Sequence, residues 1–186
     1  VSAVKSDTPL LITAAMKPEQ IKEKIGLSPL YDAALDSIEN GAPKLYCIPV
    51  EPKKKGKAGE VKHLGTGTGT ATVSGDANNA YEVTIQITEP GALNTAACKY
   101  SVNGGYTYSD EVTIPVGGAL EIPYTGLTVT FEGEFAEGDV YSFSSAAPEI
   151  DNATVLTAVE SLYNSALDFE FIHIVGTSAK ALWAAL

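Results

Sequence analysis

Arginine is absent from this 186-residue sequence, and all twelve of its basic residues are lysines. Most proteins that read phosphate or guanine depend on the planar, bidentate guanidinium group, which lysine does not replace. The 23 acidic residues give the chain a formal net charge of -11, which repels nucleic acid and anionic membranes. We therefore expect neither a nucleic-acid partner nor a membrane partner.

Histidine and cysteine are scarce, with two residues of each. Cys47 and Cys98 lie far apart inside strand-like runs, which favours buried thiols over a disulfide framework. No CxxC or HxxH spacing supports a metal site. A hydrolase triad needs a histidine beside a nucleophile, but His63 lies in a charged linker and His173 alternates with isoleucines in a strand-like segment. The sequence therefore predicts no catalytic, metal or cofactor residues, and a protein that is not an enzyme.

Long apolar runs are also missing, since none approaches the ~20 residues that cross a bilayer. Residues 1–8 lack the apolar core of a signal peptide. The only methionine is Met16, and the helical pattern over 178–186 stops without a C-cap glycine or a basic last turn. We interpret the sequence as a fragment of a longer, soluble protein, truncated at both ends.

The first part of the chain predicts strands and helices in alternation. The apolar run 9–13 suits a buried strand, and Pro18 opens a helix that Gly26 ends. A second helix is expected over 28–41, with Ser and Pro at its start, and a second apolar strand over 44–50. Strand, helix and strand in this order indicate a parallel βαβ unit.

Residues 64–148 have a different character, with short β-branched or aromatic runs separated by turn signals and no convincing helix. The run 81–87 alternates apolar and polar residues, as a half-buried antiparallel strand does. This segment contains ten acidic residues and only Lys99 as a base, a net charge of -9. Strands are expected within 71–73, 81–87, 97–102, 111–114, 127–131 and 140–143.

Helical periodicity returns after Pro148, with Asp151 or Asn152 as N-cap and an apolar stripe of Val155, Leu156, Val159, Leu162 and Tyr163. A third buried strand is expected over 169–175, and then a helix with Leu182 and Trp183. The predicted fold is therefore mixed α/β. Residues 1–62 and 149–186 form a small frame with a mainly parallel sheet, interrupted by an inserted antiparallel β-sandwich or barrel over 64–148.

Several motifs suggest chemistry but have simpler interpretations. The run Gly65-Thr66-Gly67-Thr68-Gly69-Thr70 resembles a phosphate loop, but a strand follows it instead of a helix, and no P-loop lysine is present. The lysine run 53–57 is interpreted as a solubilising linker. The carboxylates Glu132, Glu134, Glu137 and Asp139 suit a solvated rim better than a glycosidase pair. The oxygen-rich loops 75–79 and 108–111 leave calcium as an open alternative, although EF-hand order is absent.

Specific motifs make the chain similar to a known family. The N-terminal part resembles Mu-like contractile tail sheath subunits and the sheath-like DUF2586 family, in which a "lit-s" strand, an "SPL" helix start and a strand ending in "iPv" recur. Residues 64–148 resemble the same family through "ySxDGGxTyS", "tGltvtF" and "fxxGDxYsF", with Asn103 in place of the usual aspartate. The matching segments are 9–13, 27–30, 45–50, 100–109, 125–131 and 135–143.

The resemblance implies a non-enzymatic structural subunit of a phage or prophage that polymerises as rings or tubes around a tail tube protein. It also implies a β module on the outside and location in the bacterial cytoplasm, then in the virion tail. The residues leave one alternative open, a carbohydrate- or receptor-binding β module on an α/β scaffold. Four tyrosines serve it if they form an exposed platform: Tyr106, Tyr108, Tyr124 and Tyr141.

Overall fold

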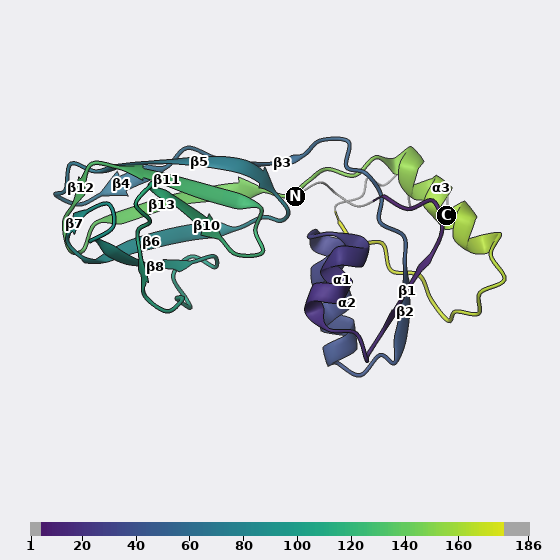
Figure 1. Cartoon of the computed structure of the whole chain (residues 1–186). Coiled ribbons are helices and arrows are strands. Elements are labelled where there is room, and N and C mark those ends of the chain that lie inside the picture. Colours follow the sequence, from purple (N-terminus) through teal and green to yellow (C-terminus); the bar gives the residue numbers. More distant parts are fainter. Residues whose placement is uncertain (1–4, 177–186) are drawn as a thin grey trace. The chain divides into compact units, whose positions relative to one another are not determined.

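The computed structural model describes residues 5–176 (Figure 1). The chain divides into two compact units. One is discontinuous and comprises Val1–Lys55 with Pro148–Leu186, and the other is the continuous stretch Gly56–Ala147. Among the described residues, the helices are too short or too polar to cross a membrane. Each unit has its own hydrophobic core, so each is described separately.

The discontinuous unit begins with a strand, two helices and a strand: β1 (Leu10–Thr13), α1 (Pro18–Ile25), α2 (Pro29–Glu39) and β2 (Lys44–Cys47). Both predicted helices are confirmed. The Ser28 hydroxyl caps α2 by accepting a hydrogen bond from the Tyr31 amide at 3.4 Å, with Pro29 in the first turn. Gly26 ends α1 with a φ of 72°, a conformation that suits glycine.

The predicted α/β fold class with a mainly parallel sheet is wrong, because the structure is mostly antiparallel β. Its βαβ unit is wrong as well, since β1 and β2 pair antiparallel, with Leu10 opposite Cys47 and Thr13 opposite Lys44. Two helices lie between these strands in the chain, so the local order of elements does not fix the direction in which β2 pairs with β1. One face of this two-stranded sheet packs against the helices, where the buried residues are Ile12, Ile21, Ile25, Leu27, Tyr31, Ala34 and Cys47.

The C-terminal part of this unit contains α3 (Asn152–Tyr163), which Asp151 precedes as N-cap residue. Only Val155 and Val159 of the predicted stripe are buried, and Tyr163 is 67% exposed. The strand predicted over 169–175 is wrong: the segment is irregular, and Phe171 is 78% exposed. A β-prone run becomes a strand only when a neighbour pairs with it. The helix expected with Leu182 and Trp183 lies outside the described residues.

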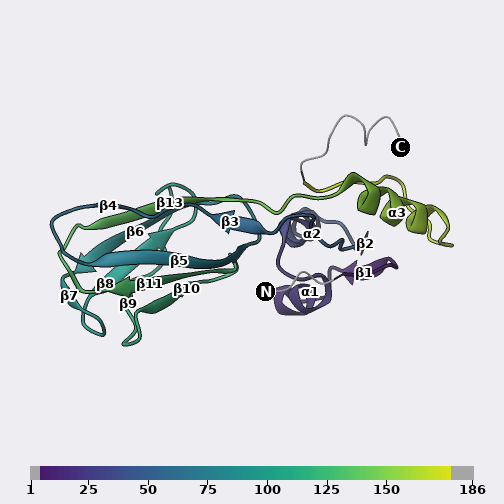
Figure 2. The same cartoon turned by 90° about the horizontal axis from the view of Figure 1, so that it is seen from above.

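The continuous unit is one curled antiparallel sheet with a short extra strand pair (Figures 1 and 2). The strands are β3 (Gly56–Ala58), β4 (Lys62–Leu64), β5 (Thr70–Ala77), β6 (Glu82–Glu89), β7 (Gly91–Ala92), β8 (Ala97–Ser101), β9 (Val112–Thr113), β10 (Ala119–Ile122), β11 (Leu127–Glu132), β12 (Glu134–Phe135) and β13 (Val140–Ala146). Among the described residues, their order in the sheet is β10-β11-β5-β3-β13-β6-β8-β9, with β4 also paired to β13, and β12 pairs with β7. The strands β3 and β4 therefore bring part of the expected linker into the sheet.

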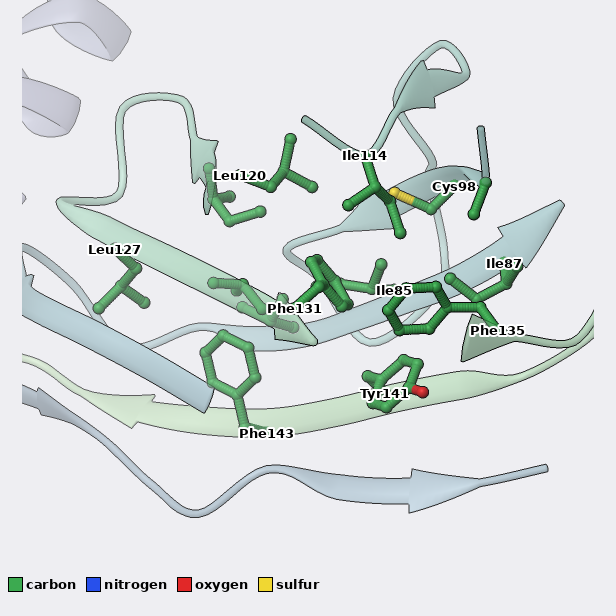
Figure 3. Packing of buried hydrophobic residues seen from close by; sticks show 14 of the residues in the cluster. Ile85, Ile87, Cys98, Ile114, Leu120, Leu127, Phe131, Phe135, Tyr141 and Phe143 are labelled. Atoms are coloured by element: carbon green, nitrogen blue, oxygen red, sulfur yellow. The ribbon is translucent and has the colours of Figure 1, made fainter. Parts of the chain in front are cut away.

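An aromatic cluster lies at the centre of this core. Phe131 from β11, Phe135 from β12 and Tyr141 from β13 meet edge to face, with ring centroids 5.6–6.1 Å apart. Figure 3 shows Ile85 and Ile87 of β6, Cys98 of β8 and Leu120 of β10 turned toward the same interior. Edge-to-face pairs add about 0.5–1.5 kcal/mol each beyond the burial of their area. These three strand ends are therefore fixed relative to one another.

We expect trypsin to cut the native chain first after Lys53, Lys54 or Lys55, well before it cuts after Lys99. All three lie outside the strands, where Lys54 forms only an isolated β-bridge with Glu149, whereas Lys99 lies in β8, which pairs with both β6 and β9. Backbone in a paired strand must open before a protease binds it. A timed digest read by intact mass spectrometry measures the order of cleavage. Equally fast cleavage after Lys99 would contradict a stable continuous unit.

Candidate functional site

The glycine–threonine segment after β4 wraps around one buried carboxylate. Asp139, just before β13, is fully buried. Its Oδ1 accepts hydrogen bonds from the backbone amides of Thr66 at 2.9 Å and Gly67 at 3.1 Å, and its Oδ2 accepts one from Ala136 at 2.9 Å. Amides that converge in this way form an anion-binding nest. The segment that resembled a phosphate loop is an anion-binding loop whose anion is the protein's own carboxylate.

Glycine is required in this loop because there is no room for a side chain at positions 65, 67 and 69. A Cβ added at Gly65 or Gly67 would overlap the Asp139 carboxylate, and one at Gly69 would overlap the Phe135 ring. Gly65 also has a φ of 153°, which L side chains rarely adopt. The alternation of glycine and threonine lets the backbone approach the carboxylate at Gly65 and Gly67 and the Phe135 ring at Gly69.

His63 is the second titratable group of this cluster. It lies on β4, beside Tyr141 of β13, and not in the linker that the sequence indicated, but the residue is exposed as expected. The two rings stack with centroids 4.5 Å apart and planes 6° apart, and Nε2 lies 3.7 Å from Asp139 Oδ2. His173, the other candidate base, is exposed and lies outside any strand.

The hydroxyl of Tyr141 is engaged in the structure. It donates a hydrogen bond to the carbonyl of Gly69 at 2.8 Å, and burial, with a smaller effect of the Asp139 charge, raises the pKa of Tyr141 to about 12. A nucleophile needs an accessible group with a lowered pKa or an adjacent base that takes its proton. The arrangement of His63, Asp139 and Tyr141 therefore holds the loop in place and does not form a nucleophilic triad.

Lowering the pH should destabilise the continuous unit through Asp139. Burial by itself would raise the pKa of this carboxyl, but the amides of Ala136, Gly67 and Thr66 and the neighbouring His63 together hold it below its ordinary value of 3.8. Because the folded-state pKa is the lower one, this contribution is complete above the ordinary value and is lost as the pH falls through the folded value. Urea unfolding between neutral and strongly acidic pH measures the loss, and an equally steep loss in Asp139→Asn would contradict it.

A second feature is the loop that joins β8 to β9. It presents Tyr106, which is 91% exposed, and Tyr108, which is 39% exposed. Tyr124, in the turn after β10, is 54% exposed, whereas Tyr141 lies in the core. The four tyrosines therefore form no common platform, and the two in this loop are the exposed pair nearest in sequence.

The comparisons with known proteins bear on the whole chain. The model of the family described as DUF2586, N-terminal domain, matches residues 1–186. This chain belongs to the DUF2586 family. No curated protein and no solved structure matches the sequence. The family thus identifies the chain as a DUF2586 domain.

In this DUF2586 domain, the motif 135–143 has a structural function. Phe135 and Tyr141 supply the aromatic cluster, Gly138 turns the chain with a φ of 85°, and Asp139 fills the nest. Sequence reasoning placed Asp139 on a solvated rim with Glu132, Glu134 and Glu137, and only those three are exposed. The sequence feature that points to Asp139 is the glycine repeat 65–69. Glycine at alternate positions lets the backbone of this loop come close to another group, which here is the Asp139 carboxylate.

In the oxygen-rich loop 75–79 of this DUF2586 domain, the side chain of Asn78 is engaged internally. The Asn78 amide nitrogen donates to the Tyr124 carbonyl at 2.6 Å, and its Oδ1 accepts from the Tyr81 hydroxyl at 2.7 Å. Within residues 5–176, no group of three or more histidine, cysteine, aspartate or glutamate side chains is placed to hold a metal ion. The polar atoms of Asn78 thus join the turn after β10 to the loop before β6.

Proposed function

We propose that this chain is a non-enzymatic structural domain of a phage or prophage contractile tail sheath or sheath-like subunit, which polymerises around a tail tube. The match of the DUF2586 N-terminal domain to all 186 residues carries the proposal. The sheath-like motifs quoted above link that family to contractile tails. On this proposal the subunit is made in the bacterial cytoplasm and ends in the virion tail.

The use of buried polar groups supports a structural role. The buried Asp139 and the hydroxyl of Tyr141 bond to backbone groups of the 65–69 loop, and Thr125 Oγ1 bonds to the Ile122 carbonyl at 2.8 Å. Side chains used in this way fix loops and turns. A subunit that carries load in a polymer needs such fixed connections.

Exposed apolar side chains in the discontinuous unit also support assembly. Phe171 is 78% exposed, Ile172 is 36% exposed, and Leu11 on the outer face of β1 is 40% exposed. Contiguous exposed apolar side chains mark interaction surfaces, and Phe171 and Ile172 are neighbours in the chain. We assign these three residues to contacts made in the assembled particle.

Electron microscopy of the full-length gene product, alone and with the tail tube protein of the same gene cluster, tests the proposal. We expect rings or tubes. A product that stays monomeric at high concentration in light scattering, with or without the tube protein, would count against a sheath. Metabolic genes in place of tail genes around it would also contradict the proposal.

A paired substitution adds a check on the assigned contacts. Phe171→Ser combined with Ile172→Ser should reduce assembly without changing the circular dichroism spectrum. The matched control is Val116→Ser, which removes an apolar side chain that is 76% exposed in the continuous unit. Equal assembly by both variants would show that Phe171 and Ile172 lie outside the contacts.

A further inference from the structure

The loop between β8 and β9 is held rigidly from within. The hydroxyl of Ser101 accepts hydrogen bonds from the amides of Asn103 at 3.3 Å and Gly105 at 2.9 Å, and it donates to Asn103 Oδ1 at 2.8 Å. The amide of Thr107 donates to Asn103 Oδ1 at 3.0 Å, and Asn103 Nδ2 donates to Thr107 Oγ1 at 2.9 Å. A loop fixed before binding loses little conformational entropy when a partner docks.

Further bonds attach this loop to the sheet. The Gly104 amide donates to the Glu82 carbonyl at 2.8 Å, and the Tyr100 amide donates to Ser109 Oγ at 3.1 Å. In return, the Ser109 amide donates to the Tyr100 carbonyl at 2.8 Å. The tip of the loop carries Tyr106, whose ring stands in solvent instead of packing on the core. The sheet therefore presents an aromatic ring at a fixed position.

Lys99 of β8 and Tyr108 of the loop already form one cation–π pair. The ammonium group of Lys99 lies 4.8 Å from the centroid of the Tyr108 ring. Cations bind over tyrosine faces because the ring carries negative charge on its face. Lys99 is the only base between residues 64 and 148, so Tyr108 takes that cation and Tyr106 stays open to one from outside.

Charge around the loop favours a cationic partner. The exposed Glu82 and Asp110 flank it, the first beside Gly104 and the second next to Ser109. Residues 64–148 as a whole have a net charge of -9. A negative surface speeds encounter with basic partners and rejects acidic ones.

We propose that this loop is a docking site for a lysine- or arginine-rich segment of a partner protein, with one basic side chain over Tyr106 and the carboxylates of Glu82 and Asp110 beside it. This docking site is separate from the contacts that assemble the subunits. A carbohydrate partner is disfavoured, because sugar sites use an open aromatic platform. Here Lys99 covers one face of Tyr108, and Tyr141 lies in the core.

The test uses the whole chain and an acetylated, amidated hexalysine peptide at low ionic strength. Amide chemical shifts should change mainly over 101–111 and at Glu82. Tyr106→Ala should weaken binding about two- to fivefold, the range of an exposed cation–π contact. Tyr106→Phe should bind like the original chain, because it keeps the ring. Tyr124→Ala is the matched control and should also bind normally, since it removes an exposed tyrosine from another turn.

Two outcomes would overturn the proposal. Equal affinity of Tyr106→Ala and the original chain, with shifts spread over all exposed carboxylates, would show that only net charge attracts the peptide. Binding to a neutral oligosaccharide array that depends on Tyr106, without peptide binding, would assign the loop to carbohydrate instead. Neither outcome depends on whether the full-length protein forms tubes.

Discussion

Asp139→Ala should cost the continuous unit about 3–5 kcal/mol of its free energy of unfolding, a large part of what holds such a domain folded. The substitution removes the acceptor of three backbone amides, those of Thr66, Gly67 and Ala136, in a site closed to water. Each buried donor left without a partner costs roughly 1–3 kcal/mol. It also removes the carboxylate that lies 3.7 Å from His63.

Urea unfolding of the two proteins, followed by tyrosine fluorescence, measures this difference. Glu137→Ala is the matched control, because it deletes an exposed carboxylate two residues away and should change stability by no more than about 0.5 kcal/mol. A similar small change in Asp139→Ala would mean that the loop closes without its anion, and the nest would then have no role in stability.

Gly67→Ala should destabilise the same unit by about 3 kcal/mol, at the upper end of what one inserted methyl group costs in a packed interior. The added Cβ would overlap Asp139 Oδ2 and lie 2.7 Å from the Ala136 amide nitrogen. Neither neighbour can yield, because that amide and that carboxylate are bonded to each other. The cost is steric, since Gly67 lacks the positive φ that would itself favour glycine.

Gly117→Ala provides the comparison, because a Cβ there meets nothing within 4 Å and the residue has no positive φ. It should leave the thermal midpoint almost unchanged, while Gly67→Ala should lower it by several degrees. In the double variant with Asp139→Ala, the cost of Gly67→Ala should shrink, because the main obstacle is gone. If the destabilisations by Gly67→Ala and Asp139→Ala simply add, the Cβ at position 67 must clash with a group other than Asp139.

Both expected results concern the contacts that hold the continuous unit together, and they give the DUF2586 motifs a structural role. The motif 135–143 and the glycine repeat 65–69 are two halves of one closure, some seventy residues apart in sequence. Closing a loop that long costs conformational entropy, and only strong contacts offset this cost. Loss of either half should therefore open this end of the sheet and leave the other end folded.

Much of the local structure was predictable from the sequence. The helices α1 and α2 follow from Pro18, the Ser28 cap and the stop at Gly26, each confirmed in the structure. The strand β6 follows from alternation of apolar and polar residues, and β8, β11 and β13 follow from short β-branched or aromatic runs between turn signals. These features depend on neighbours within a few residues, so the sequence pattern contains the information directly.

The candidate sites were less predictable. The exposed tyrosines of the β8–β9 loop were identified as candidates, but Tyr141 was grouped with them and is buried. Asp139 was interpreted as solvated and His63 as part of a linker, because nothing near either residue in sequence indicates the other. Their environment depends on β4 and β13 pairing, and that pairing joins residues far apart in the chain.

The sequence by itself determined that this chain has helical parts flanking a strongly acidic β segment, without arginine and with few groups for catalysis. Composition and short-range periodicity are sufficient for these conclusions. Only the tertiary structure decided that β1 and β2 run antiparallel, that 169–175 is not a strand, and that Asp139 fills the glycine loop. Strand direction, strand partners and the burial of a charge all depend on long-range contacts, which local periodicity does not encode.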